Sequence, residues 1–430
     1  MAFMKTISST HWPFVFLLAL LTFFHLWGIP LVPFHPDEST QLFMSSDFET
    51  LFIQPASMAW DPAREEDLRQ HYREFDAPLT RYTIGLGRWI RRLPALSVDW
   101  EWPKTWQGNS LAGALPEPQL LYTGRFMVTL LLEVSLVLIY CSGYHLGGYR
   151  MGLLAVLCLG TNALVLLHSR RAMAESALTM GIALAIWSFL QGEKRPWFAG
   201  AGIALAFNAK QSALALLPVG LVAVCWLSRG TTNPTRKIVR NVCVYLGVFG
   251  LITLALNPLL WSNPGGALRA AWAARNAWIE KSSMEKLLSG QIVTAMPQRT
   301  AVLLSNLYIR PLTFQEVDSY HTEASAAEAV YLRNPAHNLL RGSVGGGVHL
   351  YLTLLGLMLA IQQLRITDHD DRRMLSLLLL MTLAQAVALT LFVHLSWQRY
   401  VIPMVPFISL WEAYVVTTLF ARIARHFEQS

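Results

Sequence analysis

Long apolar runs recur along the whole chain and predict membrane-spanning helices. A helix needs about 20 apolar residues to cross the hydrocarbon layer of a bilayer. The pattern predicts ten spans, at 13–33, 122–141, 151–167, 174–190, 198–209, 211–227, 242–260, 348–364, 374–395 and 401–420. The first run is too long for a signal-peptide core and should remain in the mature protein. We therefore expect an all-α polytopic membrane protein.

Residues 198–227 can form one long helix or two short ones, because Lys210 lies near the middle of this apolar stretch. A lysine at the bilayer centre costs about 2.5–3.5 kcal/mol on insertion scales. Two half-length helices would instead place Lys210 near one surface. Two spans also keep the basic segments around Arg236 and Arg425 inside, as the positive-inside rule requires. We predict a hairpin with Lys210 at its outer turn.

Two long polar segments, 34–120 and 261–347, interrupt the apolar pattern, whereas the other connections are short. With both termini cytoplasmic, the two segments become the first and second extracytoplasmic loops. Residues 65–75 and the stretch from Ala267 to Leu288 have helical character and are expected to lie along the outer surface. No internal repeat is evident. Residues 1–430 are therefore predicted to form a single membrane module whose chemistry lies outside.

Composition agrees with this assignment, since 53% of the residues are hydrophobic and only 14% are charged. The net charge of +7 comes from the inner segments. Their expected cations are Lys5, Arg150, Lys194, Arg195, Arg229, Arg236, Lys237, Arg240, Arg365, Arg372, Arg373, Arg422 and Arg425. The basic balance thus reflects topology and excludes a nucleic-acid partner. The chain has no N-x-S/T sequon, which favours a prokaryotic plasma (inner) membrane.

The four cysteines lie in or beside apolar runs, so neither a disulfide in the polar loops nor thiolate ligation of a metal is expected. Two adjacent carboxylates, Asp37 and Glu38, follow the first span in the sequence FHPDEST. Such a pair can be a solvated loop start or a helix cap. Beside a membrane-embedded site, a carboxylate can instead act as general base towards a hydroxyl. We take Asp37 and Glu38 as the candidate catalytic residues.

Further along the first loop, Asp76 and Arg81 lie in DAPLTRYTIGLGR, and Arg125 opens the second span. These arginines can anchor an interfacial helix by snorkelling, or they can approach an anionic group. Glu133 lies within the second span. Acids at that depth usually face the bundle interior, so structural pairing is expected for Glu133.

Cations also occupy the short outer turns, against the positive-inside trend. Arg170, Arg171 and Glu175 lie in HSRRAMAES, and Lys210 and Arg399 complete the set. Guanidinium groups pair with phosphate oxygens in a bidentate way, which favours a site for a membrane-bound phosphate. An Arg171 to Glu175 pair at i, i+4 spacing is the structural alternative, and both can hold together.

The order of these motifs resembles the GT-C membrane glycosyltransferases, above all protein O-mannosyltransferases and aminoarabinose-type transferases. The resemblance rests on FHPDEST, DAPLTRYTIGLGR, GRFMVTLLLEVSLVLIYCSGYHLGG, HSRRAMAES, NAKQSALALLP, NPLLWSNP and QRYVIPMVPF. It implies inverting transfer of a sugar from a polyprenyl- or dolichyl-phosphate carrier to an acceptor on the outer face. Asp37 would match the base, Glu38 its acidic neighbour, and Lys210 and the outer arginines the cations that hold the phosphate. The resemblance requires no nucleotide cofactor and no metal.

Two departures from the family pattern concern the donor. The usual His-Pro-Pro-Leu element appears as Asp76, Ala77, Pro78 and Leu79, and Glu175 replaces an aspartate. The resemblance implies a hexosyl- or pentosyltransferase whose acceptor is a glycolipid, a cell-envelope glycan or another small hydroxyl compound. A transporter or lipid flippase is the main alternative, and a non-catalytic scaffold is another. Transporters tend to show inverted repeats and charges near the midplane, whereas here the charges collect on outer turns.

Overall fold

The computed structural model describes residues 11–191, 195–227, 233–284, 292–316, 320–366 and 369–429. Over these residues the protein is helical, with one isolated bridge between Ile292 and Leu395 and no named strand. The predicted all-α fold class is confirmed. Three of the predicted inner cations, Lys5, Lys194 and Arg229, lie outside the described residues.

The first apolar run forms helix α1, and the first polar segment folds into a group of short helices. This part of the chain comprises α1 (Trp12–Trp27), η2 (Ile29–Leu31), α2 (Pro36–Met44), α3 (Asp47–Ile53), η3 (Pro55–Met58), η4 (Pro62–Arg64), α4 (Leu68–Phe75), α5 (Leu79–Ile90) and α6 (Trp106–Leu111). Helix α4 matches the helix expected at 65–75. The Asp67 carboxylate caps it by accepting a hydrogen bond from the Arg69 backbone N–H at 2.9 Å.

Segment α7 (Pro118–Gly160) contains two helices joined at Gly147 and Gly148. Gly148 has φ 80°, in the left-handed region that glycine adopts without strain. The two arms lie against each other, because a Cβ atom at Gly143 would come within 2.9 Å of the Gly152 Cα. This agrees with the two separate runs predicted at 122–141 and 151–167.

The chain also breaks at Lys210, as predicted. Helix α10 ends at Ala209, Lys210 is extended, and a 3₁₀ segment follows. This region comprises α8 (Ala163–His168), α9 (Glu175–Leu190), α10 (Pro196–Ala209), η5 (Gln211–Leu216), α11 (Leu217–Leu227) and α12 (Pro234–Leu256). Helices α9 and α10 approach closely at Gly181, where a Cβ would lie 2.3 Å from the Ala206 Cα. Small residues of this kind allow close packing of helices within a membrane.

The second polar segment carries the helix expected from Ala267 to Leu288, now α13, although residues 285–288 lie outside the described residues. From here the chain forms η6 (Pro258–Leu260), α13 (Pro264–Met284), α14 (Met296–Leu304), the π-helical turn η8 (Ser305–Ile309), α15 (His321–Leu332), η10 (Pro335–Asn338), α16 (Gly342–Gln363), α17 (His369–Phe392), η11 (Gln398–Met404) and α18 (Val405–Gln429). The two polar segments are in contact. The Trp60 backbone N–H donates to the Leu259 carbonyl at 3.1 Å, and the Ser262 hydroxyl donates to the Trp60 carbonyl at 3.0 Å.

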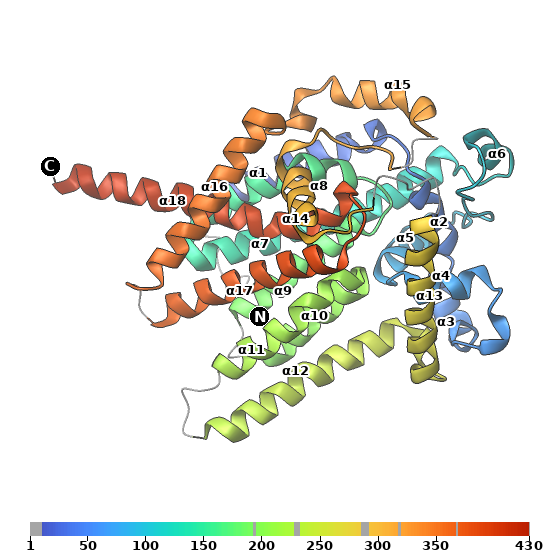
Figure 1. Cartoon of the computed structure of the whole chain (residues 1–430), viewed down its shortest axis with the longest axis horizontal. Coiled ribbons are helices and arrows are strands. Elements are labelled where there is room, and N and C mark those ends of the chain that lie inside the picture. The colour runs from blue at the N-terminus through green and yellow to red at the C-terminus, as the bar shows by residue number, and fades with distance from the viewer. Residues whose placement is uncertain are drawn as a thin grey trace.

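Within the described residues, six segments are long and apolar enough to cross a membrane: Trp12–Leu31, Pro118–Gly160, Pro234–Leu256, Gly342–Gln363, Asp370–Phe392 and Gln398–Phe427. Glu175–Leu190 and Gln211–Trp226 are shorter apolar helices. The exact count of ten spans therefore stays a prediction. In Figure 1 the helices α2 to α6 gather at one end of the molecule, and the carboxyl end of α18 lies at the other.

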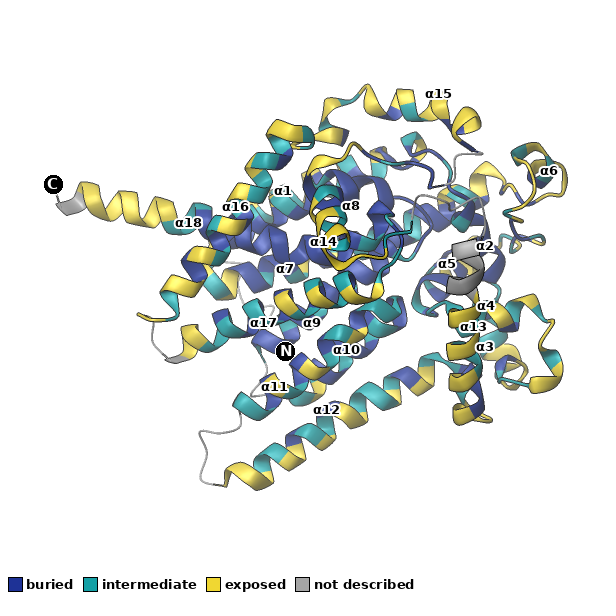
Figure 2. Ribbon diagram, in the orientation of Figure 1, coloured by how far each residue is buried: buried dark blue, intermediate teal, exposed yellow. Residues whose placement is uncertain are grey.

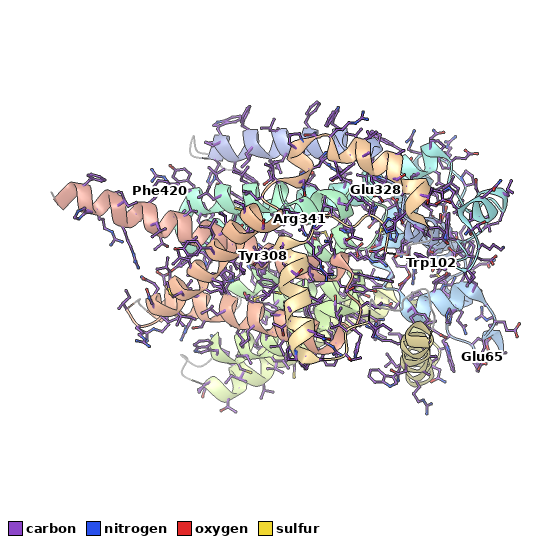
Figure 3. All side chains as sticks on the ribbon, turned by 45° about the horizontal axis from the view of Figure 1, so that its top comes forward. Glu65, Trp102, Tyr308, Glu328, Arg341 and Phe420 are labelled. Atoms are coloured by element: carbon purple, nitrogen blue, oxygen red, sulfur yellow. The ribbon has the colours of Figure 1, made fainter. Side chains whose placement is uncertain are left out.

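Burial follows this arrangement, with the most buried residues at the centre of the helix bundle (Figure 2). The largest core cluster joins α1, α7, α9, α10, α16, α17 and α18. Apolar side chains nevertheless remain exposed on the outside of the bundle. Phe420 is one of them and projects from α18 in Figure 3. Helices that bury one side in the bundle and expose apolar side chains on the other are expected of a protein surrounded by lipid.

Glu133 has the structural partners predicted for it. Its carboxylate accepts a hydrogen bond from the Thr22 hydroxyl at 2.8 Å and lies 2.7 Å from His25 Nδ1. The other ring nitrogen of His25 contacts the Gly160 carbonyl at 2.8 Å. Glu133 thus ties α1 to α7 inside the bundle.

Candidate active site

Helix α2 begins immediately after the extended residue His35 and carries Asp37 and Glu38 in its first turn. Pro36 occupies the first helical position, where the missing N–H has no cost. His35 Nδ1 accepts the backbone N–H of Asp37 at 3.1 Å, and Glu38 accepts the backbone N–H of His35 at 3.0 Å. The predicted alternative of a helix cap is thus confirmed for Glu38.

Glu38 is fully buried and forms a bidentate pair with Arg125. Arg125 Nε and Nη2 each donate to one Glu38 oxygen at 2.7 Å, and the Ala172 N–H donates at 2.8 Å. Arg125 Nη1 also donates to the carbonyls of Ile29 and Val32. Burial alone would raise the pKa of Glu38, but Arg125, Arg171 and the Ala172 N–H together lower it. We assign both residues to holding α2 in place, in contrast to the predicted catalytic and substrate-binding roles.

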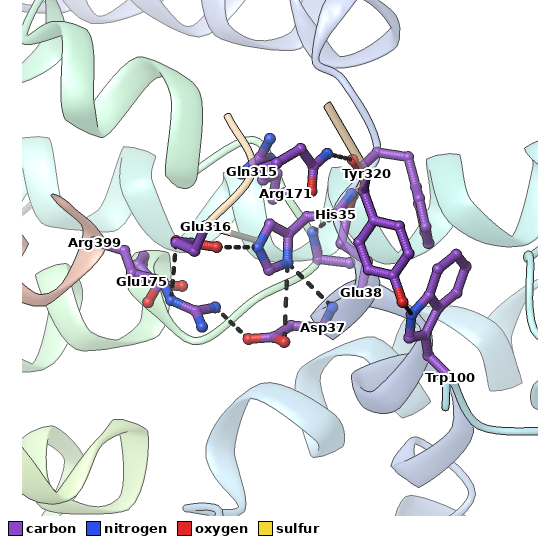
Figure 4. Close-up of polar contacts among 12 residues, drawn as sticks. His35, Asp37, Glu38, Trp100, Arg171, Glu175, Gln315, Glu316, Tyr320 and Arg399 are labelled. Carbon is purple, nitrogen blue, oxygen red and sulfur yellow. Dashed lines mark hydrogen bonds and ion pairs between the residues drawn. The ribbon is translucent and has the colours of Figure 1, made fainter. Parts of the chain in front are cut away.

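Asp37 projects from the same turn into a different set of contacts (Figure 4). Its carboxylate forms an ion pair with Arg399 Nη1 from η11. Arg399 Nε lies 3.3 Å from Glu316, which belongs to the second polar segment. The Asp37 side chain is 32% exposed, whereas those of Arg399 and Glu316 are 5% and 3% exposed. Asp37 is thus the accessible member of a buried charge network.

His35 connects this network to the helix cap. Because its Nδ1 accepts a backbone N–H, the neutral ring carries its proton on Nε2. Nε2 lies 2.5 Å from the Glu316 carboxylate and donates to it in this tautomer. Burial opposes ionisation of Glu316, but Arg399 and His35 lower its pKa well below the ordinary value. Glu316 is therefore a carboxylate held between two cationic or donor groups.

Lys210 lies at the break between α10 and η5 and contacts Glu175, the first residue of α9. Lys210 Nζ donates to Glu175 Oε1 at 2.8 Å, and the second Glu175 oxygen is buried without a hydrogen-bond partner. Lys210 Nζ also lies 5.0 Å from the centre of the Tyr400 ring, in cation–π contact. Because its side chain is 26% exposed, Lys210 can reach a ligand.

Asp76 ends helix α4 and lies within electrostatic range of Asp37, Lys210 and Arg399. Burial is the main cause that raises the pKa of Asp76 to about 6, and the charge of Asp37 adds to it. The pKa of Asp37 shifts the other way. Burial opposes its ionisation, but Arg399 and His35 lower the pKa of Asp37 below its ordinary value. Two nearby carboxyl groups therefore titrate in different pH ranges.

Arg81 has internal partners. Its Nε lies 3.2 Å from Asp47, and its Nη1 donates to the Asp76 carbonyl at 3.2 Å. Asp47 is fully buried and also accepts two hydrogen bonds from Arg73. The anionic group near Arg81 is thus a carboxylate of the protein. This differs from the substrate-binding role predicted for Arg81.

Arg170 and Arg171 are also internal. Both are 0% exposed and donate to backbone carbonyls: Arg170 to Phe24 at 2.9 Å, and Arg171 to Phe314 at 2.8 Å. Arg170 also contacts His337 at 3.1 Å. Neither guanidinium is accessible to a phosphate. The alternative i, i+4 pair between Arg171 and Glu175 is not formed, because Glu175 pairs with Lys210.

The structure therefore brings part of the predicted set together with two residues that sequence reasoning missed. We call this group the charged cluster; it consists of His35, Asp37, Asp76, Glu175, Lys210, Glu316 and Arg399. His35 lies in the FHPDEST motif but was given no role there, and Glu316 was not predicted. Its local sequence, FQEVD, does not distinguish Glu316 from the other acids of the outer loops. In the described part of the chain, no group of three or more His, Cys, Asp or Glu side chains is arranged to hold a metal ion.

Comparisons with known proteins agree with this architecture. Residues 121–261 match the family model described as dolichyl-phosphate-mannose-protein mannosyltransferase. No curated protein matches the sequence significantly. Among solved structures, the fold is similar to ArnT from Cupriavidus metallidurans, solved with bound undecaprenyl phosphate. The TM-score is 0.58 at 13% identity, over 95% of this chain and 60% of that one.

Two structures from Archaeoglobus fulgidus have the same fold. The oligosaccharyltransferase AglB, in complex with an inhibitory peptide and a dolichol-phosphate, gives a TM-score of 0.53 at 14% identity, over 97% of this chain and 52% of that one. The apo oligosaccharyltransferase gives 0.55 at 13% identity, over 99% and 52%. This chain thus spans between about half and three fifths of the length of these structures. It is a multi-pass membrane protein with the GT-C fold, as the motif order implied.

Proposed function

We propose that this protein is a glycosyltransferase that moves a sugar from a polyprenyl-phosphate carrier to an acceptor hydroxyl. The observation that carries the proposal is the charged cluster, in which the accessible carboxylate Asp37 lies beside the cations Arg399 and Lys210. The GT-C fold and the family-model match support it. The bound lipid phosphates of the similar structures support the carrier class.

The reaction needs a base on one side of the sugar and cations on the other. The acceptor oxygen forms a bond to the anomeric carbon, and its proton passes to Asp37. The bond between that carbon and the phosphate oxygen breaks, and its electron pair stays on the phosphate. Attack opposite the leaving phosphate inverts the anomeric carbon. A positioned base is typically worth about 10²- to 10⁴-fold in rate.

Lys210 and Arg399 are the cations suited to the departing phosphate. Lys210 offers an accessible ammonium, and Arg399 offers a planar guanidinium that pairs with phosphate in a bidentate way. Cations placed where negative charge develops stabilise the transition state most in a site from which water is excluded. Asp76 and Glu175 border these cations and complete the proposed substrate site.

The proposed setting is the extracytoplasmic face of a prokaryotic plasma membrane, with both termini cytoplasmic. The loops 34–120 and 261–347 would then receive a glycolipid or cell-envelope glycan as acceptor. Hydrogen bonds between the two polar segments support their action as one unit. Hexose and pentose donors both fit this proposal.

The test is a radiolabelled sugar-transfer assay with the purified protein in lipid nanodiscs. A panel of undecaprenyl-phosphate sugars serves as donors, and glycolipid extracts serve as acceptors. Mass analysis of glycolipids and wall glycans from cells with and without the protein identifies the product. A missing sugar in the deletion strain, restored by the wild-type chain but not by Asp37→Asn, supports the proposal. Vesicle transport of the donor without any transfer would favour a flippase instead.

A further inference from the structure

We propose that Arg399 is shared between the base and the donor: in the unliganded protein it pairs with Asp37, and the donor phosphate displaces Asp37 from it. The displaced carboxylate then accepts the proton of the acceptor hydroxyl. This inference rests on the proposed function and adds to it an order of substrate binding. The donor binds first, and its binding activates the base.

Arg399 contacts one carboxylate at each side of its guanidinium. Nη1 pairs with Asp37, and Nε lies 3.3 Å from Glu316. Glu316 is fixed further by His35, whose Nε2 lies 2.5 Å from its second oxygen. His35 in turn is fully buried and fixed by the cap of α2. Glu316 is therefore the permanent anchor of Arg399 and acts as a positioning residue.

Asp37 is the exchangeable partner. Its side chain is 32% exposed, against 3% for Glu316, so an incoming anion reaches the guanidinium on the Asp37 side. The Arg399 guanidinium also lies 4.7 Å from the centre of the Trp397 ring and 5.7 Å from that of Tyr400. These rings and Glu316 hold the guanidinium in place while its Nη1 exchanges Asp37 for the donor phosphate.

The exchange has a chemical consequence for the base. A carboxylate paired with a guanidinium holds a proton poorly, because the cation favours the ionised form. Once the phosphate takes the Arg399 contact, Asp37 faces a negative group and becomes a better proton acceptor. An acceptor hydroxyl is then activated only when a donor is in place.

The experiment measures the affinity for undecaprenyl phosphate of the full chain in nanodiscs at pH 7.5. If Asp37 competes with phosphate for Arg399, Asp37→Asn tightens binding by about 5- to 10-fold, a typical size of coupling between sites. The variant should fold, because Glu316 still compensates Arg399. Asp61→Asn is the matched control, since Asp61 is an exposed acid of the same loop that also pairs with an arginine, Arg64. It should leave the affinity unchanged.

A double-mutant cycle separates exchange from simple repulsion. In an Arg399→Gln background, Asp37→Asn should not increase the affinity for undecaprenyl phosphate, because there is no guanidinium to release. A gain that persists there would show general repulsion of phosphate by Asp37 and would overturn the inference. Unchanged or weaker binding by Asp37→Asn alone would also overturn it, while the proposed function stands. Failure of the wild-type chain to bind undecaprenyl phosphate would instead remove the proposed function together with the inference.

Discussion

Arg125 donates two hydrogen bonds of 2.7 Å to the two oxygens of Glu38, and the Glu38 side chain is fully buried. The pair joins helix α2 to helix α7. The two residues are 87 positions apart in the sequence. It fixes the turn from which Asp37 projects. The orientation of the proposed base thus depends on a buried neighbouring ion pair.

Glu38→Gln should destabilise the protein strongly, because it leaves the Arg125 charge buried and uncompensated. Removal of one partner of a buried ion pair costs about 3–5 kcal/mol. Thermal unfolding in detergent, followed by circular dichroism, measures the effect. Asp61→Asn, which breaks an exposed pair with Arg64, should cost less than about 1 kcal/mol. Equal midpoints for the two variants would contradict this role of Glu38.

Asp37→Asn should abolish sugar transfer while binding of the lipid phosphate persists. The loss of a general base typically lowers the rate by about 10²- to 10⁴-fold. Single-turnover transfer and the binding assay, run on the same preparation, separate the two effects. Normal turnover by this variant would remove Asp37 as the base.

Lys210→Met should weaken the affinity for the polyprenyl-phosphate donor about tenfold or more, because a hydrogen bond to a charged group contributes about 1.5–3 kcal/mol. Lys210→Arg keeps the charge and should retain part of the affinity. Lys104→Met serves as the control, since Lys104 lies on the surface and pairs with Glu101. If the Lys210 and Lys104 variants bind the donor equally well, Lys210 is not a phosphate ligand.

Glu316→Gln should lower kcat more than it changes the KM for the donor, because Arg399 loses its anchor. The charge of Glu316 raises the pKa of Asp37, so its removal lowers that pKa. The acidic limb of the pH profile of kcat should therefore move to lower pH.

Glu133→Gln provides the control for this experiment, because Glu133 also pairs with a buried histidine, His25, but makes no contact with the charged cluster. It should reduce stability and leave the pH profile in place. An acidic limb that stays unmoved in Glu316→Gln would limit Glu316 to a structural role.

Asp76 should make stability depend on pH between about 4 and 6. Burial raises the pKa of Asp76 from the ordinary 3.8 to about 6 in the folded protein, so folding favours the protonated form. Its contribution is complete below the unfolded pKa and is lost as the pH rises through about 6. Asp76→Asn should flatten this part of the curve of unfolding midpoint against pH. A curve that matches wild type would contradict the raised pKa.

Much of the fold was readable from the sequence, because apolar runs and the charges that interrupt them act locally. The break at Lys210 follows from the cost of a charge within an apolar stretch, and the two arms of α7 follow from two separate apolar runs. Asp37, Lys210 and Arg399 were likewise recognised as charges at the ends of predicted spans. Such features need no knowledge of distant partners.

The partners of buried charges were not readable in this way. Arg170 and Arg171 bind backbone carbonyls at Phe24 and Phe314, and nothing in the sequence marks those carbonyls as available. Glu316 lies 281 positions from His35, so no local spacing connects them. Whether an arginine serves a ligand or the protein itself depends on tertiary contacts that composition and periodicity do not contain.

The ion pair between Asp37 and Arg399 joins residues that are 362 positions apart. During synthesis the acid therefore emerges early and waits for its partner until nearly every later helix has been inserted. Premature termination anywhere before η11 leaves that acid without its counter-ion. The charged cluster is therefore complete only once the chain has been made as far as η11.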